Sequence, residues 1–267
     1  MANPHRSGMN DAGWSVVQAA ARAAERIADA NEPAVFALGA DGGLRAVPAG
    51  DSKFRRGLSA RRDIVERYAR WGAEGRDPSA GEISEARRCV GYEKIEASAP
   101  DRIRLRSDCV EIDLGGIGKG YAVDRAIGVL KAAGIRHALI NAGSSSIASI
   151  GSPPDRQGWP VLLNARVAGH QILLLRDRSI STSEQSSSGE IIDPRTGAPA
   201  ESKLAVSVVA PSATVSDALS TTLLMLPLED AMKLLPQFDN VSALWMTRTG
   251  ELKAVYGESR LQLSGSR

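Results

Sequence analysis

The amino-acid sequence predicts an α+β, or mixed α/β, fold with antiparallel sheets flanked by helices. Two kinds of segment support this class: runs with apolar residues at helical spacing, and short runs that are apolar throughout or at every second position. The segments do not follow the strict strand–helix–strand order of a parallel sheet, which favours antiparallel pairs. The 267 residues, 43% of them hydrophobic, are enough for one large domain or two small ones.

The helices are predicted from apolar spacing together with the residues at their ends. Ser79 stands three residues before Glu82, which is the spacing of a capping box, and Gly91 is placed to end the same helix. Thr214 or Ser216 is placed to cap the helix that follows the apolar segment LAVSVVA. The predicted helical ranges are 13–30, 63–72, 79–91, 120–134, 214–226 and 228–238.

The predicted strands are short. In IRLR (Ile103 to Arg106) apolar and charged residues alternate, as expected for a half-buried strand. Ala168 and Gly169 separate two apolar runs and predict a hairpin. The predicted strand ranges are 92–98, 101–107, 109–114, 136–143, 159–167, 170–182, 203–211 and 241–247.

The composition argues against several classes of function. Lys and Arg number 33 and Asp and Glu 31, so a net charge of +2 gives no general attraction to nucleic acid or to a membrane surface. Two cysteines, Cys89 and Cys109, do not predict a disulfide framework. The chain has only three histidines, His5, His137 and His170, which leaves few candidates for a histidine-based zinc site or a Ser-His-Asp triad.

The sequence also bears on location. No run reaches the ~18 apolar residues of a membrane span. The N-terminus has neither the pattern of a signal peptide nor an early cysteine for lipid attachment. We therefore expect a cytoplasmic protein as the chain is written, or a periplasmic protein if an export signal is missing from it.

The segment DLGGIGKGYAVD, Asp113 to Asp124, places four glycines and a lysine at a predicted strand-to-helix turn. It is not a P-loop, because Lys119 is followed by Gly120 rather than by Ser or Thr. It is not a GxGxxG fingerprint either, because Tyr121 occupies the place of the third glycine. A glycine-rich turn at a helix start aims backbone N–H groups at an anion. On its residues alone, a packing turn and a phosphate-binding turn are equally well supported.

Two later segments are rich in small or turn-forming residues. INAGSSSIASIG (Ile140 to Gly151) permits close approach by a ligand or by another strand, and its residues favour the structural interpretation. DPRTG (Asp193 to Gly197) is a turn sequence, in which Arg195 can pair with Asp193 or with a phosphate.

A third segment, VSDALSTTLLML (Val215 to Leu226), carries polar side chains at helical spacing. If it is helical, Asp217 shares a face with Ser220 and Thr221. A carboxylate beside hydroxyl groups suits an oxygen-liganded ion such as Mg²⁺. The alternative is a capped helix whose early Asp interacts with the helix dipole.

Taken in this order, the segments resemble the ApbE family of Mg²⁺-dependent FAD:protein FMN transferases. The family pattern has DLGGIAKGYAVD, NAGG, a TSG stretch before HIIDPRTG, and VVAP followed by ADALATAL. This sequence has DLGGIGKGYAVD, NAGSSS, STSEQ, EIIDPRTG, VVAPSA and SDALSTTL, and the resemblance covers roughly residues 78–235. It implies an ApbE-like fold for residues 78–267, with residues 1–77 a diverged N-terminal region of the same globular unit.

The resemblance implies roles for individual residues. Lys119 would lie near the phosphates of the flavin nucleotide, and Ile192 would contact the nucleotide through its backbone. The main-chain carbonyl of Gly116 would join the helix side chains around Mg²⁺. The implied cofactor-binding residues are Asp113, Lys119, Asn141, Ile192 and Arg195, and the implied metal-binding residues are Gly116, Asp217, Ser220 and Thr221.

The resemblance implies a reaction as well. The FAD pyrophosphate would be cleaved, FMN would be attached to a Thr or Ser hydroxyl of an acceptor protein, and AMP would leave. Lys119 and Glu190 would be the catalytic residues. Glu190 stands where the family has a histidine as candidate base, and a carboxylate is intrinsically a weaker base than imidazole.

Two alternatives remain open from the sequence. One is hydrolysis of FAD to FMN and AMP in the same site. The other is a flavin-binding protein of the same family with impaired catalysis. In each case FAD is the ligand, and neither a nucleic-acid partner nor a membrane span is expected.

Overall fold

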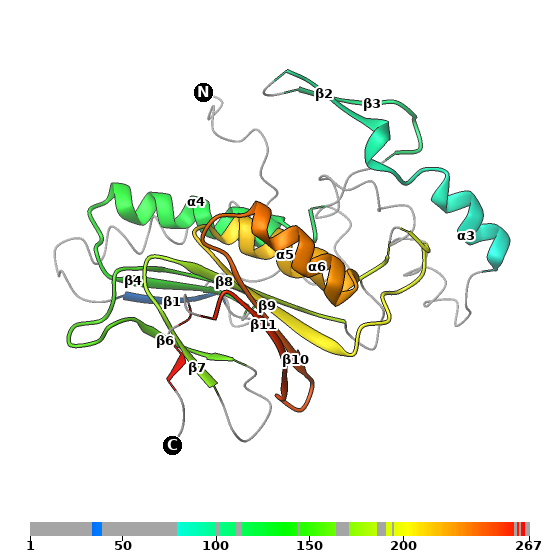
Figure 1. Ribbon diagram of the computed structural model, residues 1–267. Coiled ribbons are helices and arrows are strands. Elements are labelled where there is room, and N and C mark those ends of the chain that lie inside the picture. Colours follow the sequence, from blue (N-terminus) through cyan, green and yellow to red (C-terminus); the bar gives the residue numbers. More distant parts are fainter. Residues whose placement is uncertain are drawn as a thin grey trace, which may run out of the picture. The chain divides into compact units, whose positions relative to one another are not determined.

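The computed structural model describes residues 34–38, 79–99, 102–110, 114–143, 145–163, 171–185, 191–193, 195–258, 261 and 263–264 (Figure 1). These residues divide into two compact units. Unit 1 draws on Met1–Phe54, Gly116–Glu184 and Ser202–Arg267, and unit 2 on Arg55–Gly115 and Gln185–Glu201. The helices predicted at 13–30 and 63–72 lie outside the described residues, so the predicted boundary at residue 77 stays a prediction.

Unit 1 contains a large sheet, a small sheet and helices. Its helical elements are α4 (Gly118–Ala132), α5 (Ala213–Met225), α6 (Leu228–Leu234) and the 3-10 helix η2 (Leu235–Gln237). The strands are β1 (Ala34–Leu38), β4 (Ala138–Ala142), β5 (Ser146–Ile150), β6 (Trp159–Leu163), β7 (Gln171–Leu175), β8 (Ser179–Glu184), β9 (Leu204–Ala210), β10 (Ser242–Thr247), β11 (Leu252–Tyr256) and β12 (Leu263–Ser264).

The large sheet has seven described strands in the order β1-β4-β5-β8-β9-β10-β11. β1 runs parallel to β4, and each of the other neighbouring pairs is antiparallel. The small sheet, in the order β12-β7-β6, is antiparallel throughout. Together with the helices, these sheets confirm the predicted α+β class.

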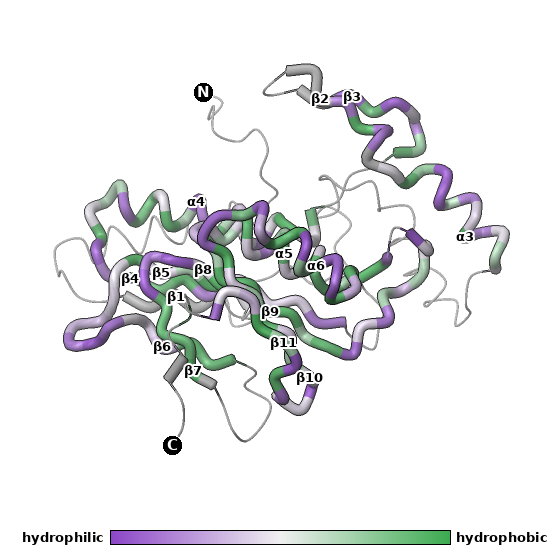
Figure 2. Tube along the Cα trace, viewed as in Figure 1, coloured by the Kyte–Doolittle hydropathy of each residue, from purple (hydrophilic) through white to green (hydrophobic). Residues whose placement is uncertain are grey.

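Unit 1 is built in three layers, with α4 and α5 on one face of the large sheet and the small sheet on the other (Figure 1). Strand alternation sorts the apolar residues between the two faces. Ile140 of β4 packs against Leu130 of α4. Ile147 of β5 packs on the opposite face, with Leu173 of β7. Figure 2 shows hydrophobic residues along β6 and β7, the strands that cover this second face.

Unit 2 contains α3 (Ala80–Arg87), the 3-10 helix η1 (Tyr92–Lys94) and the antiparallel pair β2 (Ile95–Ala99) and β3 (Arg102–Leu105). The predicted capping box is confirmed. The Glu82 amide donates to the Ser79 hydroxyl at 3.3 Å, and the Ser79 amide donates to the Glu82 carboxylate at 2.9 Å. These bonds satisfy N–H groups that a short helix otherwise leaves without partners.

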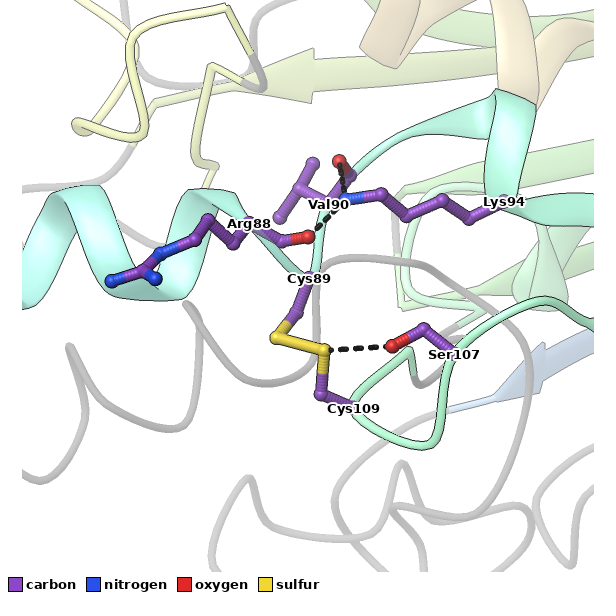
Figure 3. The surroundings of a disulfide bond; sticks show 6 residues. All are labelled: Arg88, Cys89, Val90, Lys94, Ser107 and Cys109. Carbon is purple, nitrogen blue, oxygen red and sulfur yellow. Dashed lines mark hydrogen bonds between the residues drawn. A yellow bond between two sulfur atoms is a disulfide. The ribbon is translucent and has the colours of Figure 1, made fainter.

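The expectation that the two cysteines form no disulfide framework is wrong for unit 2. Cys89 and Cys109 are joined by a disulfide, with their Cα atoms 5.4 Å apart and 20 residues of separation along the chain (Figure 3). The β2–β3 hairpin lies between them and turns the chain back, which spacing alone does not reveal. Beside the disulfide, the Lys94 ammonium donates to the carbonyls of Arg88 and Val90 (Figure 3).

Several element boundaries differ from the prediction. Ser212, and not Thr214 or Ser216, caps α5: its hydroxyl accepts the Val215 N–H at 3.2 Å. The range 170–182 spans β7 and the start of β8, and Asp177, with a φ of 51°, lies between the two. β1, β5, β11 and β12 were not predicted as separate strands, and the described residues of 109–114 form none. No helix in the described part of the chain combines the length and the apolar character needed to cross a bilayer.

Candidate functional site

The first turns of α4 and α5 meet closely in unit 1. A Cβ added to Gly120 would lie 2.1 Å from the Ala213 carbonyl oxygen and 2.7 Å from the Asp217 Cβ. Only glycine allows the two helices to approach this far. The Gly120 N–H donates to Asp217 Oδ2 at 2.8 Å. The glycine-rich turn therefore serves, at this position, to bring a carboxylate against the start of α4.

Asp217 is a buried carboxylate, with 2% of its surface exposed. Burial raises its pKa, and several interactions act in the opposite direction: the positive charge of Lys119, and hydrogen bonds from the Gly120 N–H, the Ser146 hydroxyl and the Lys119 N–H. Because burial outweighs these interactions, the negative charge is only partly compensated by the protein. A bound cation would supply the missing compensation.

Thr221 lies one helical turn after Asp217, on the side of α5 that Gly116 approaches. A Cβ added to Gly116 would lie 3.3 Å from Thr221 Cγ2 and 3.5 Å from Thr221 Oγ1. The Thr221 hydroxyl donates to the Asp217 carbonyl at 3.3 Å and lies 3.1 Å from the Ser183 hydroxyl. The structure thus brings together Gly116, Lys119, Asp217 and Thr221, although their functional roles stay predictions.

Ser220 lies in the same region but is fully buried. Its hydroxyl donates to the Asp217 carbonyl at 3.0 Å and lies 2.8 Å from the Ser183 hydroxyl. The Thr221 hydroxyl has the same two partners, but Thr221 is only partly buried and also lies beside Gly116, whereas Ser220 is fully buried. The metal-binding role predicted for Ser220 stays a prediction that the geometry favours less than that of Thr221.

A row of buried serines connects this region to the large sheet. Ser181 of β8 lies 2.8 Å from Ser216 of α5 and donates to Ser146 of β5 at 3.1 Å. Ser146 in turn is hydrogen-bonded to Asp217. The sequence motifs did not predict this hydrogen-bonded row. The signal that could have found it is the alternation Ser179, Ser181, Ser183, which puts three hydroxyls on one face of a strand.

Asn141 lies in β4, in the row of residues that faces away from α4. Ala138, Ile140 and Ala142 of the same strand pack against α4, and alternation turns Leu139 and Asn141 to the other face. Leu139 accordingly packs with the cluster that contains the small sheet. The cofactor-binding role of Asn141 stays a prediction.

Ile192 and Arg195 lie in unit 2, in the turn that follows β8. Ile192 is buried against Ala86 of α3. The Arg195 guanidinium pairs with the Asp193 carboxylate at 2.7 Å. The main-chain carbonyl of Arg195 accepts a hydrogen bond from the Arg87 guanidinium at 2.6 Å. The sequence allowed Arg195 to pair with Asp193 or with a phosphate, and in the structure it pairs with Asp193. Their predicted contacts with the nucleotide are not tested by this geometry.

Two predicted site residues, Asp113 and Glu190, lie outside the described residues, so their roles stay predictions. Within the described part, no three His, Cys, Asp or Glu side chains gather into a metal-binding cluster. Among the described residues, a cation beside Asp217 would have this one carboxylate, with the neutral hydroxyl of Thr221 and the backbone of Gly116 nearby. This donor set fits Mg²⁺, which is commonly held by one or two carboxylates together with substrate phosphates.

Comparisons with known proteins agree with the motif pattern. A family model described as the ApbE family matches residues 63–245. A protein from Treponema pallidum named FAD:protein FMN transferase is 29% identical over 185 residues, covering 61% of this chain and 51% of that protein. One of the same name from Rhodobacter capsulatus is 31% identical over 163 residues, covering 57% of this chain and 31% of that protein. The chain thus spans about half, or less, of the length of these two relatives.

The fold has a counterpart among solved structures. The flavinyl transferase ApbE from Pseudomonas stutzeri, in its apo form, superposes with a TM-score of 0.61 at 24% sequence identity. The match covers 93% of this chain and 72% of that one. At this identity the similarity establishes the fold and not the reaction.

Proposed function

The chain belongs to the ApbE family, and on that premise we propose that it is an FAD:protein FMN transferase that depends on Mg²⁺. FAD would be the substrate. The acceptor would be a protein that offers a Thr or Ser hydroxyl, and the second product would be AMP. The observation that carries the proposal is the position of Asp217 and Thr221 beside Gly116 and Lys119 in unit 1.

The charges in this region suit a diphosphate. Asp217 provides a single negative charge, so a divalent cation bound there keeps a net positive charge, and the Lys119 ammonium adds another. The two phosphates of FAD carry the opposite charge. We propose that the Asp217 carboxylate, the Thr221 hydroxyl and the Gly116 carbonyl hold the cation. A bound Mg²⁺ would polarise the phosphoryl oxygens and offset the charge that develops on them.

The proposed transfer is a displacement at phosphorus. The acceptor hydroxyl oxygen forms a bond to the phosphorus of the FMN half. The bond from that phosphorus to the bridging oxygen breaks, and AMP leaves with the electron pair. The hydroxyl proton passes to a base, for which we propose Glu190, while Lys119 stabilises the phosphate charge by its ammonium group.

The test is to incubate the protein with FAD and Mg²⁺, with and without an acceptor protein, and to measure AMP and protein-bound flavin. Transfer predicts AMP and covalently bound FMN only when the acceptor is present. AMP without an acceptor would indicate hydrolysis of FAD, and retention of flavin without AMP would indicate a binding protein. Either of these two results would overturn the proposed transfer.

Variants separate the proposed roles. Asp217→Ala should abolish the Mg²⁺-dependent release of AMP, and Thr221→Val should reduce it strongly. Ser220→Ala should have the smallest effect, because Ser220 is fully buried, whereas Thr221 is the residue that lies beside Gly116. Glu190→Gln should slow transfer and alter its pH profile. An unchanged rate and profile for that variant would remove Glu190 from the mechanism.

A further inference from the structure

The starts of α4 and α5 are each capped by a carboxylate from the other helix. Asp217 of α5 accepts hydrogen bonds from two successive N–H groups of α4, those of Lys119 and Gly120. Asp124 of α4 accepts from two successive N–H groups of α5, those of Ala213 at 2.7 Å and Thr214 at 2.8 Å. We call this pair of contacts the carboxylate exchange.

Neither helix provides this charge for itself. Neither α4 nor α5 has an acidic residue in its first turn, and Ile117 at the start of α4 makes no side-chain cap. The N–H groups of a first helical turn lack partners within the helix and carry a partial positive charge. A carboxylate from the neighbouring helix satisfies both requirements at once.

The carboxylate exchange fixes α5 along its axis and in rotation. Asp124 binds the N–H groups of Ala213 and Thr214, and it also accepts from the Thr214 hydroxyl. Ser212 binds the next N–H group, that of Val215. Three successive amides are therefore held, two of them by a residue of α4 that lies 89 and 90 positions earlier in the chain.

The residues that follow on α5 are those of the candidate site. Asp217 lies one turn after Ala213, and Thr221 lies one turn further on. Lys119 lies in the first turn of α4, and Gly116 lies two residues before that helix begins. A small slide or rotation of α5 against α4 would therefore change the close approach of Thr221 to Gly116.

We propose that Asp124 is a positioning residue of the cation site: it does not touch the cation but holds α5 so that Asp217 and Thr221 face Gly116. The inference rests on the proposed function, since it takes the cation to bind at these residues. Groups that orient metal ligands from outside the coordination shell commonly change metal affinity by about 10- to 100-fold when they are removed.

The test measures cation affinity directly, with Mn²⁺ as the probe, by the electron paramagnetic resonance signal of unbound Mn²⁺. The full chain is compared with Asp124→Asn, which keeps the size of the side chain but removes its charge. We expect Mn²⁺ affinity to fall about 10-fold or more. The rate of AMP release should recover at high Mg²⁺ concentration, since the ligands themselves remain.

Two further variants complete the comparison. Asp230→Asn is the matched control, because Asp230 is exposed on α6 and pairs with Lys233. It should leave Mn²⁺ affinity unchanged. Thr214→Val removes one donor to Asp124 at nearly constant shape and should weaken Mn²⁺ binding in the same direction but less. This milder variant decides the question if Asp124→Asn does not fold.

The outcomes separate the inference from the function on which it rests. Wild-type protein that binds no Mn²⁺ would overturn both. Equal Mn²⁺ affinities of the wild type and folded Asp124→Asn would overturn the inference alone. If Asp124→Asn does not fold, equal affinities of the wild type and Thr214→Val would do the same. Weakened binding in the variants, together with a wild-type protein that transfers no FMN, would support the positioning role and overturn the proposed reaction.

Discussion

Asp217 combines two tasks that place opposite demands on a carboxylate. As a partner of the α4 N–H groups it must be buried, and burial raises its pKa. As a proposed cation ligand it must be ionised. The Lys119 charge and the hydrogen bonds around Asp217 favour the ionised form only in part. Ionisation of Asp217 therefore costs stability in the absence of a cation, and a cation bound as proposed would offset that cost.

This leads to a prediction for the stability of the metal-free protein. A carboxyl group whose pKa is raised in the folded state gives its full stabilisation below the unfolded pKa, here 3.8, and loses it as the pH rises through the folded pKa. The raised pKa of Asp217 thus lowers the free energy of unfolding as the pH rises above 3.8. Without divalent cations, Asp217→Asn should melt at or above the wild-type temperature at pH 7. Each kcal/mol corresponds to about 2–4 °C.

The pH dependence provides the check. Thermal melts followed by circular dichroism should show the difference between Asp217→Asn and wild type shrinking as the pH falls toward 4. Mg²⁺ should raise the melting temperature of the wild type and not that of the variant. The opposite result would be an Asp217→Asn protein that melts several degrees below the wild type at pH 7, with the two melting temperatures not converging in acid. It would show that Lys119 and the hydrogen bonds around Asp217 compensate its charge fully. Asp230→Asn serves as the exposed control.

Gly120 is the residue that permits the contact between α4 and α5. In Gly120→Ala the new Cβ would meet the Ala213 carbonyl group and the Asp217 Cβ at 2.1–2.7 Å, and neither can move without shifting α5. Overpacking of this kind costs about 1–3 kcal/mol. We expect Gly120→Ala to lower the free energy of unfolding by that amount and to weaken Mn²⁺ binding.

Gly128 of the same helix is the matched control for this substitution. Apart from its chain neighbours and the nearby backbone of α4 itself, no described atom lies within 4 Å of a Cβ added there. Gly128→Ala should therefore stabilise α4 by about 0.5–1 kcal/mol through the lower entropy of the unfolded chain. Urea titrations of both variants measure the difference. Equal stabilities for the two would mean that the helices can separate at Gly120 without loss.

At the scale of the elements, local signals predicted what local interactions determine. The capping box of α3 and the apolar runs of β4, β6 and β9 were recognised, because each depends on residues that are close in sequence. The predicted cap of α5 was wrong for Thr214, because the Thr214 hydroxyl donates to Asp124 of α4, which is distant in sequence. β11 and β12 were missed, because their short segments are defined by pairing with β10 and β7.

The same distinction applies to the site. The spacing of Asp217 and Thr221 predicted that they share a helix face, and the glycine-rich turn predicted a close backbone approach. The sequence could not predict which backbone approaches, since Gly120 and Asp217 lie 97 residues apart. Asp124 closes the motif DLGGIGKGYAVD, yet its role becomes visible only when α4 and α5 are placed side by side.

The disulfide of unit 2 is an element that can be tested separately. Cys89 and Cys109 close a loop around the β2–β3 hairpin. A disulfide across a loop of this length contributes on the order of 3 kcal/mol by restricting the unfolded chain. We expect dithiothreitol to speed hydrogen exchange in α3, β2 and β3 of the wild type. It should have no effect on the double variant Cys89→Ser, Cys109→Ser, which should already exchange quickly.

Thiol titration tests whether the disulfide forms at all. The unfolded, unreduced wild type should show no thiol that reacts with Ellman's reagent, because both cysteines are paired. Two reactive thiols in protein purified under oxidising conditions would show that the bond does not form. An intact bond would also suit an oxidising compartment, where such bonds persist, rather than the cytoplasm.

For the whole molecule, the proposed roles divide between the two units. The proposed cation ligands Gly116, Asp217 and Thr221 lie in unit 1, whereas Ile192 and Arg195, predicted to bind the nucleotide, lie in unit 2 together with the disulfide. Loosening unit 2 should therefore impair nucleotide binding without impairing cation binding. In the double variant Cys89→Ser, Cys109→Ser, we expect Mn²⁺ affinity to stay within about twofold of wild type, because the cation ligands keep their support.

The affinity for FAD, measured by flavin fluorescence at saturating Mg²⁺, should fall several-fold in the same double variant. Asp124→Asn should give the converse result at low Mg²⁺. Its cation binding should be weak, while the amides of α3 stay protected from hydrogen exchange and the disulfide stays intact. A double variant that loses Mn²⁺ binding in parallel with FAD binding would show that the two units act as one. The cation site would then depend on residues beyond the contact between α4 and α5.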